Sequence, residues 1–599
     1  MAKLAHSKLT RALRWIMQPV TAQLPLFVIS FLLMAANPIL RGLQALPQLA
    51  HGMWPENLTL SATYLGISLL IAYCIALTAH AVNRRWVKIL LYAIMVMLFG
   101  VFCFVELNFH SIITPTIMMA MAETNTGETG EFFEQFAFSW QSLATYAAVA
   151  VVCVIIVILE RRHAKKLERN GTRRVPLPVL AILLAAVAWG ATCMRHYHQL
   201  LSADFLSELE QSQMFSHSTY AMDNVTDWIY CLKAVESSKN EVDRSIKSTL
   251  ASLKRPISTQ ADSLTVILVI GESYIKSHAS LYGYPLGTTP HMNAMRESGN
   301  LVAFDNCISP FNTTNVSLKN TLCTNSVGDG QQWYNSPYWP SLIAKAGYVV
   351  TMWDNQYSFS PLAGGGSLDA LLYNDKIEKS TYSARNTQSF KHDGELIDDY
   401  FKQMSKTGLD TLPRRFVMFH LMGQHVTPAK RYPKQYNIFK GTDPAYAKWP
   451  AAQAQYRAEY DNATLYNDAV IDTIIKHYAN QSAIMVYFSD HGEEAYDFRN
   501  CFGRQNDPVK NKDILHYQND VPLVVWFSSK YAFEHPDVVT RLKQSAMRPM
   551  MLDLIGHMLL DIAQVKTEVY QSSHNVLSSD YHCPPRITYG NVDYDKVCR

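Results

Sequence analysis

The chain has 599 residues, a net charge of +3 and a charged fraction of 17%, below the roughly 25% of an ordinary soluble protein. At about 100–200 residues per domain, it is too long for one simple domain. Apolar residues gather in roughly the first 200 positions, which excludes a wholly soluble protein, and the polar remainder excludes a pure membrane bundle. The 11% of aromatic residues excludes intrinsic disorder, and the near-neutral charge predicts no nucleic-acid partner.

Residues 1–195 contain five apolar stretches, each about as long as the roughly 20 residues that a membrane-spanning helix needs. Buried helices of a large soluble protein are one alternative, and five such stretches so close together disfavour it. A cleavable signal peptide is another, but the first stretch is long and no small-residue cleavage site follows it. We therefore expect a transmembrane domain of five helices, at 20–40, 59–82, 87–108, 141–159 and 176–194.

Lysine and arginine are distributed in a way that predicts the orientation of these helices. They precede the first stretch and follow the second and the fourth, whereas the loop at 107–139 contains none. Because basic loops stay in the cytoplasm, the N-terminus is predicted to be cytoplasmic and the chain after about residue 195 to lie on the opposite side. The basic residues are Lys3, Lys8, Arg11, Arg14, Arg84, Arg85, Lys88, Arg161, Arg162, Lys165, Lys166, Arg169, Arg173 and Arg174.

Residues 196–240 form a connector between the apolar region and the rest of the chain. Its amphipathic segment fits a helix that lies along the membrane interface. It fits equally well a linker helix that packs on the following domain. The sequence leaves both interpretations open.

Six cysteines follow the apolar region: Cys231, Cys307, Cys323, Cys501, Cys583 and Cys598. An even number of cysteines in an oxidising compartment predicts disulfides, with Cys307–Cys323 and Cys583–Cys598 as the local pairs. The alternative is that they are free thiols or metal ligands. No C-x-x-C pair occurs, which argues against a structural zinc site.

The remaining residues, 241–599, alternate short β-branched runs with helical stretches. Runs that are apolar on both faces and separated by helices are typical of a parallel sheet covered on both sides. We therefore expect an α/β domain with a mostly parallel central sheet behind the five-helix bundle. The strands are expected at 264–270, 348–353, 415–421, 483–488 and 521–527, and helices at 339–346, 394–405, 453–477 and 548–562.

Candidate metal ligands follow three of these strands. Glu272 follows the first strand, His425 the third, and the pair Asp490–His491 the fourth, with His516 further along the chain. Sites in open α/β sheets form at the carboxyl ends of the strands, so these side chains are expected to converge. Two carboxylates with histidines suit zinc, with manganese as the other metal, and they predict one site while leaving a second open. The simpler interpretation of Asp490–His491 is a helix cap.

A nucleophile is expected within the hydroxyl-rich segment 307–323. A threonine beside a metal at a helix N-terminus can lose its proton and attack phosphorus, and the helix amides favour a phosphate there. An ordinary helix cap explains the same residues. The residues alone leave Thr313, Thr314 and Ser317 as alternatives.

Together the motifs resemble those of the membrane-bound phosphoethanolamine transferases that modify lipopolysaccharide, within the alkaline phosphatase/sulfatase-like superfamily. The resemblance covers the whole chain and adds a sulfatase-like fold to the expected α/β domain. Its motifs are GESYIKSHASLYGYPLGTTP (271–290), TTNVSL (313–318), WDNQ (353–356), HDGELID (392–398), HLMGQHVTPAKRYP (420–433), EYDNATLYNDAVI (459–471) and SDHGEE (489–494).

The resemblance implies roles for individual residues. It makes Glu272, Asp490 and His491 zinc ligands, with Thr314 as the nucleophile that also contacts the metal. It implies that His425 is a catalytic histidine near the substrate phosphate or a second metal, and that His516 is a further catalytic histidine whose match is the looser one. Asn355 and Gln356 align with positions that contact the phosphoethanolamine group.

The implied activity is transfer of phosphoethanolamine from phosphatidylethanolamine to lipid A or a core sugar of lipopolysaccharide, through a phosphorylated threonine. The implied location is the bacterial inner membrane, with the catalytic domain of a monomer in the periplasm, and polymyxin resistance is a consequence that the family suggests. Sulfatases fit less well, because no arginine follows Cys307 in their motif. Glycerol phosphate transfer of the lipoteichoic acid synthase type is the main alternative, and a non-catalytic membrane scaffold is another.

Overall fold

The computed structural model describes residues 11–12, 14–49, 56–109, 112–114, 117–118, 130, 132–134, 136–170, 185–191, 195–205, 222–357, 366–504 and 511–598. The contacts within the chain divide it into two compact units, Met1–Asn240 and Glu241–Arg599. Helix α14 (Asn224–Ser252) runs across this boundary. It begins after Asp223, whose Oδ1 accepts the backbone N–H groups of Val225 and Thr226 at 3.1 Å and so satisfies the first turn.

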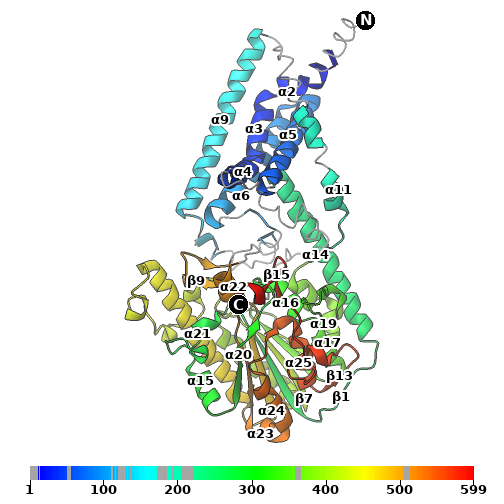
Figure 1. Ribbon diagram of the computed structural model, residues 1–599, viewed down its shortest axis with the longest axis vertical. Helices are drawn as coiled ribbons and strands as arrows, with labels where there is room; N and C mark the ends of the chain where they lie inside the picture. Colours follow the sequence, from blue (N-terminus) through cyan, green and yellow to red (C-terminus); the bar gives the residue numbers. More distant parts are fainter. Residues whose placement is uncertain are drawn as a thin grey trace. The chain divides into compact units, whose positions relative to one another are not determined.

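The N-terminal unit is helical (Figure 1). Within the described residues, three helices are long and apolar enough to cross a membrane: Leu58–Val82, Arg85–Phe109 and Trp140–Lys166. They confirm helices at three of the five expected spans. The fifth, at 176–194, lies mostly outside the described residues. The helices of this unit are α2 (Gln18–Ala22), α3 (Leu24–Met34), α4 (Ala36–Leu49), α5 (Glu56–Val82), α6 (Arg85–Phe109), α9 (Trp140–Asn170) and α11 (Arg195–Ser202).

The first expected span, 20–40, differs from the prediction because it is broken. Helices α3 and α4 meet at Ala35 with a bend of 48°, and only the two together meet the length and composition of a span. Pro38 gives the physical reason: it has no N–H to donate, and its ring excludes the carbonyl of Met34, where α3 ends. Counted together, the two helices supply a fourth candidate span at the place where the first one was expected.

Helices α5 and α6 hold the N-terminal unit together. Helix α5 packs against α2, α3 and α4, and α6 packs against α3 and α9. Glu160 of α9 accepts hydrogen bonds from Lys88 Nζ at 2.7 Å and from Tyr92 Oη at 2.6 Å, both on α6. The outer faces of α6 and α9 expose large apolar side chains such as Ile89 and Val154, as expected for helices that face lipid.

The C-terminal unit is built on a seven-stranded sheet. All five predicted strands belong to it, and β3 and β6 complete it. Its order is β3-β11-β8-β2-β7-β5-β6, and β11 alone of these strands runs antiparallel to its neighbours, so the expected mostly parallel sheet is confirmed. The strands are β2 (Leu264–Gly271), β3 (Leu301–Phe304), β5 (Val349–Asp354), β6 (Ala384–Arg385), β7 (Arg414–His420), β8 (Ala483–Ser489) and β11 (Leu523–Phe527).

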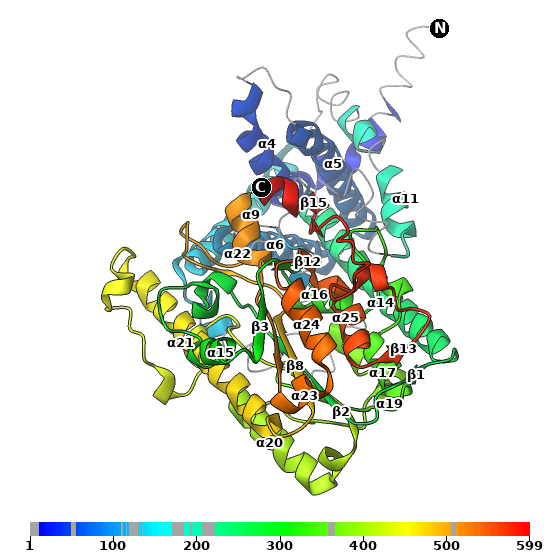
Figure 2. The ribbon, with the colours of Figure 1, turned by 60° about the horizontal axis from the view of Figure 1, so that its bottom comes forward.

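Helices cover both faces of this sheet (Figure 2). On one face, α15 (Pro290–Glu297), α20 (Asp393–Thr407) and α21 (Ala451–Tyr478) form a hydrophobic core cluster with inward residues of the central strands. On the other, α17 (Trp339–Lys345) places Trp339 edge-on against Phe416 of β7, and it contacts α25 (Ile555–Ile562). Because helices cover both faces, the central strand β2 is buried along its whole length and is apolar except for Thr265.

The predicted helix at 548–562 begins later than expected. Met550 and Met551 form strand β12, which pairs with β4 (Cys307–Ile308), and the α-helix starts at Ile555. Tertiary pairing with β4 overrides the helical pattern at this end. The other elements are β1 (Ser258–Thr259), α16 (Thr314–Thr321), α18 (Leu368–Leu372), α19 (Asp375–Thr381), β9 (Glu494–Ala495), β10 (Phe502–Gly503), α22 (Lys512–Asn519), α23 (Ser529–Glu534), α24 (Pro536–Ser545), β13 (Val565–Lys566), β14 (Ile587–Thr588), β15 (Val592–Asp593) and α26 (Tyr594–Cys598).

The expected disulfides are not formed in the structure. Among the described residues, the six cysteines outside the predicted spans are free thiols. Two of them contact other groups: Cys323 Sγ lies 3.8 Å from Ser245 Oγ, and Cys583 Sγ lies 3.4 Å from the carbonyl oxygen of Pro584. The pairings Cys307–Cys323 and Cys583–Cys598 therefore stay predictions.

Candidate active site

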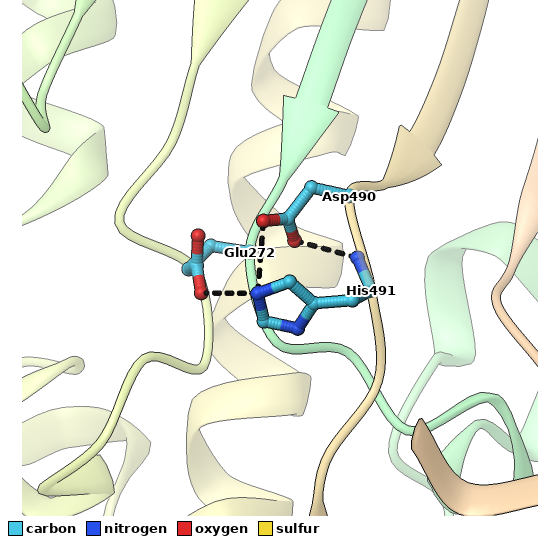
Figure 3. Close-up of side chains that lie close together, drawn as sticks. All are labelled: Glu272, Asp490 and His491. Carbon is cyan, nitrogen blue, oxygen red and sulfur yellow. Dashed lines mark hydrogen bonds and ion pairs between the residues drawn. The ribbon is translucent and has the colours of Figure 1, made fainter. Parts of the chain in front are cut away.

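Glu272, Asp490 and His491 converge at the carboxyl ends of two neighbouring parallel strands (Figure 3). Strands β2 and β8 pair so that Gly271 lies beside Ser489, and the next residues of both strands therefore leave the sheet at the same place. One donor atom from each of the three side chains lies within 4.8 Å of the others, and all three residues are buried. The sheet topology thus brings together residues more than 200 positions apart.

The backbone around Glu272 is shaped to aim its carboxylate. Ser273 has φ +55°, a strained value for a residue other than glycine, and its Oγ donates to Glu272 Oε1 at 2.6 Å. Gly423 approaches closely from the loop after β7, where a Cβ atom would lie 2.9 Å from the backbone nitrogen of Glu272. Gln356 Nε2 donates to Glu272 Oε2 at 3.2 Å. The carboxylate is therefore held from both oxygens.

His491 presents one ring nitrogen to the cluster. Its Nδ1 lies 2.9 Å from the carbonyl of Gly492, whereas its Nε2 lies 3.0 Å from Asp490 Oδ2 and 3.4 Å from Glu272 Oε1. Burial lowers the pKa of His491 to about 3, so the imidazole is neutral, which is the form that binds metal ions. Gly492 allows this turn, because a Cβ atom there would lie 2.2 Å from the carbonyl oxygen of Tyr517.

The three side chains fit a divalent metal ion. Asp490 Oδ1 accepts the N–H groups of Ser273 at 3.2 Å and of His491 at 2.8 Å, but its buried Oδ2 has no hydrogen-bond donor among the described residues. A buried carboxylate oxygen without a donor, beside a second carboxylate and a neutral imidazole, is costly unless a cation satisfies it. Two carboxylates and one histidine form a ligand set that suits zinc or manganese.

Thr314 is the candidate nucleophile that contacts this cluster. It is the first residue of α16, and its Oγ1 lies 2.9 Å from Glu272 Oε2 and 3.2 Å from His491 Nε2. Thr313 is the preceding N-cap residue, and its side chain makes no capping bond. Ser317 is buried, and its Oγ donates to the carbonyl of Asp490 at 2.6 Å. Of the three hydroxyls left open by the sequence, Thr314 is the one placed among the ligand side chains.

The two predicted catalytic histidines lie in different surroundings. His425 belongs to the loop after β7, and its ring is influenced by Glu272, Arg504 and His491; burial lowers its pKa to about 3. Its Nδ1 is buried without a hydrogen bond among the described residues. His516 lies on α22 instead, where its Nδ1 is 3.5 Å from Asp520 Oδ2 and its ring contacts Tyr517. The structure therefore brings His425, and not His516, next to the candidate ligands.

The two predicted substrate-binding residues also separate. Gln356 Nε2 donates to Glu272 and to the carbonyl of Leu421, the latter at 2.7 Å. Asn355 faces the base of the loop: its Nδ2 donates to Asp393 Oδ1 at 2.9 Å and its Oδ1 accepts the N–H of Phe390 at 2.7 Å. These contacts favour positioning roles for both residues.

Sequence reasoning did not identify three further residues of the site. Asp393 accepts the N–H groups of Met422 and Gly423, both at 2.9 Å, and so fixes the loop that carries His425. His420, at the end of β7, lies 3.0 Å from Asp354 and is fully buried. Arg504 contacts His491 Nε2. Asp393 belongs to a motif already noted, whereas nothing in the sequence distinguishes Arg504 from an ordinary loop arginine.

Known proteins resemble both units. A family model described as phosphoethanolamine transferase EptA/EptB matches residues 61–204, and a sulfatase model matches residues 265–557. Phosphoethanolamine transferase EptC of Escherichia coli is 25% identical over 505 residues, covering 80% of this chain and 82% of that protein. Kdo(2)-lipid A phosphoethanolamine 7''-transferase of Salmonella typhimurium is 25% identical over 295 residues, covering 48% of each chain.

A solved structure resembles the chain as a whole. The integral membrane protein lipooligosaccharide phosphoethanolamine transferase A of Neisseria meningitidis matches with a TM-score of 0.60, over 93% of this chain and 97% of that one. At 16% identity this likeness shows the fold: a helical N-terminal region followed by a sulfatase-like domain. The two family models and the motif-bearing site agree: over residues 61–204 the chain is similar to phosphoethanolamine transferases EptA/EptB, and over residues 265–557 it is similar to sulfatases.

Proposed function

We propose that the protein transfers phosphoethanolamine from phosphatidylethanolamine to lipopolysaccharide, at lipid A or a core sugar, by way of Thr314. The observation that carries the proposal is the position of the Thr314 hydroxyl, 2.9 Å from Glu272 Oε2 and 3.2 Å from His491 Nε2, at the start of α16. A hydroxyl at a helix N-terminus within a metal-ligand cluster is suited to attack phosphorus. Related proteins carry this activity in their names.

The reaction has two balanced steps. Thr314 Oγ1 loses its proton and attacks the phosphorus of phosphatidylethanolamine, the phosphorus–glycerol bond breaks, and diacylglycerol leaves with a proton. A hydroxyl of lipopolysaccharide then loses its proton and attacks the same phosphorus, the bond to Thr314 breaks, and Thr314 Oγ1 takes a proton back. Each step is an in-line displacement in which charge spreads over the phosphoryl oxygens. Holding Thr314 at a fixed place between Glu272 and His491 provides the alignment.

Glu272, Asp490 and His491 would hold the metal ion, which we propose to be zinc. When bound, such an ion lowers the pKa of a hydroxyl and stabilises negative charge on phosphoryl oxygens. The protein's own residues orient the ligands: Ser273 and Gln356 fix the Glu272 carboxylate, and Gly492 fixes the tautomer of His491. We propose that His425, in the loop after β7 that also carries Gly423 against Glu272, exchanges a proton with the leaving or attacking oxygen.

The apolar helices of the N-terminal unit fit the proposed substrates. Donor and acceptor are both lipids, so a chain held in the bilayer meets them by diffusion in two dimensions. We propose that the protein is a monomer of the bacterial inner membrane, with a cytoplasmic N-terminus and a periplasmic catalytic domain. The basic residues at Arg84, Arg85 and Lys88 between the second and third spans support this orientation.

The test is the intact mass of the full chain in detergent, loaded with zinc and incubated with phosphatidylethanolamine. We expect wild type to gain one phosphoethanolamine group, Thr314→Ala to gain none, and Thr313→Ala to behave as wild type. Peptide mapping locates the adduct. A gain of glycerol phosphate from phosphatidylglycerol would instead place the chain with the lipoteichoic acid synthase type. No adduct with either lipid, and none on Thr314, would contradict the proposal.

A further inference from the structure

Arg504 lies against the metal-ligand cluster, although it comes from a different element. Strand β10, which it follows, pairs antiparallel with β9, so that Gly503 lies beside Glu494 and the chain returns to the Asp490–His491 turn. Gly503 has φ +78°, a conformation that glycine adopts without strain, and it redirects the chain just before Arg504. The hairpin therefore delivers one arginine side chain to the site.

The guanidinium of Arg504 lies against two side chains of the metal-ligand cluster, His491 and Glu272. Its Nη1 contacts His491 Nε2 and lies 3.8 Å from Glu272 Oε1. Its side chain is 21% exposed, whereas those of Glu272 and His491 are fully buried. Thr314 is also partly exposed. Arg504 and Thr314 thus form the open side of the cluster, the side from which a substrate reaches the hydroxyl.

A purely structural ion pair does not explain this position. The oxygens of Glu272 already accept from Ser273 at 2.6 Å, Thr314 at 2.9 Å and Gln356 at 3.2 Å, whereas Arg504 stays at 3.8 Å. Arg499, in the same hairpin, shows the contrast: its Nε donates to Glu494 Oε2 at 2.5 Å and its Nη2 to the other oxygen, a bidentate pair. Among the described residues, no carboxylate takes Arg504 in this way.

A metal ion and the guanidinium compete for one atom. His491 Nε2 has a single lone pair, so a cation bound there takes the place of Arg504 Nη1. Repulsion between the two positive charges would then favour a position of the guanidinium further from the ligands and nearer to solvent. A forked pair of N–H donors at that place matches two oxygens of a phosphodiester.

We infer that Arg504 is a catalytic residue that binds the non-bridging phosphoryl oxygens of the donor phosphodiester while the group moves to and from Thr314. The inference rests on the proposed function and deepens it by naming the residue that recognises the phosphoryl group. It forms no covalent bond: Arg504 donates N–H hydrogen bonds to oxygens whose negative charge grows as the Thr314–phosphorus bond forms and the glycerol–phosphorus bond breaks. Arg504 thus takes a position in the site for which the family resemblance implied His516.

The experiment uses the full chain in detergent as wild type, Arg504→Gln, Arg504→Lys and the matched control Arg499→Gln. Three quantities are measured: zinc affinity by chelator competition, the rise in thermal midpoint of the zinc-loaded protein with inorganic phosphate, and kcat and KM for phosphatidylethanolamine. Arg504→Gln is expected to keep or increase zinc affinity, to lose the stabilisation by phosphate, and to lower kcat by about 100-fold to 1,000-fold. Arg499→Gln is expected to keep the phosphate response.

Arg504→Lys keeps the charge but loses the fork, so its kcat should lie between those of wild type and Arg504→Gln. It also decides the question if the glutamine variant does not fold. A phosphate response and kcat of wild-type size in Arg504→Gln would overturn the inference, and so would loss of zinc, which would make Arg504 part of the metal site. Failure of the proposed function is separate, because wild type itself would then form no adduct on Thr314.

Discussion

The N-terminal unit exposes large apolar side chains along its long helices, whereas the C-terminal unit buries charged ones at the edge of its sheet. Ile89, Met97 and Val154 are exposed on α6 and α9, and Glu272 and Asp490 are fully buried. In water both choices are unfavourable. The first becomes favourable when lipid is the surrounding solvent, and the second when a cation and aligned donors replace water. Exposed apolar side chains therefore mark the unit that is suited to lipid, and buried charged side chains mark the unit that carries the candidate active site.

The largest expected effect comes from breaking the buried cluster. Asp490→Asn removes one charge from the ligand set, and because residues that only support ligands cost about 10–100-fold, loss of a direct ligand should lower zinc affinity and transfer by more than about 100-fold. Zinc content after dialysis and the rate of transfer measure this. Asp513→Asn, an exposed carboxylate on α22, is the control. Full zinc content in Asp490→Asn would contradict the assignment of the ligand.

The second prediction tests the apolar surface. Val154 is 57% exposed near the middle of α9, and Phe533 is 87% exposed on α23 of the C-terminal unit. If α9 faces lipid, Val154→Arg should cost about 3 kcal/mol in membrane insertion, whereas Phe533→Arg should change stability by less than about 0.5 kcal/mol. The measurement is the fraction of chain that stays in alkali-washed membranes. Equal effects of the two substitutions would show that the two surfaces meet the same solvent.

The smallest effect concerns a buried charge away from the candidate ligands. His278 lies between two carboxylates, with Nδ1 2.6 Å from Asp461 and Nε2 2.9 Å from Asp497. Burial by itself lowers the pKa of His278, but Asp497 and Asp461 outweigh it and raise the pKa to about 9. Because the folded pKa exceeds the unfolded value of about 6.5, the stabilisation is complete below about pH 6.5 and is lost as the pH rises through 9.

We therefore expect the free energy of unfolding to fall by at most about 3 kcal/mol between about pH 6.5 and pH 9.5. Denaturant unfolding of the full chain in detergent, followed by near-ultraviolet circular dichroism, measures it. His278→Asn should flatten this dependence, since it removes the titrating group. The same slope in both proteins would assign the dependence to other residues.

The sequence predicted the strands well because both faces of the sheet are covered. Five apolar runs without a polar face became β2, β5, β7, β8 and β11, with ends that differ by at most a few residues. It failed where distant segments decide. Met550–Met551 is a strand because β4 pairs with it. Local patterns carry no information about such pairings.

The sequence by itself determined the residue types of the site and their places at strand ends, because a parallel sheet gathers the residues that follow its strands at one edge. On that ground the sequence predicted Glu272, Asp490 and His491 as candidate metal ligands. The residues alone left Thr313, Thr314 and Ser317 open, and the family resemblance pointed to Thr314. The tertiary structure places the Thr314 hydroxyl beside Glu272, and it alone places Arg504, rather than His516, against His491. The reason is that a hydroxyl or a guanidinium acts in a site only when it lies about 3 Å from its partner atoms. The number of residues between two segments does not determine that distance.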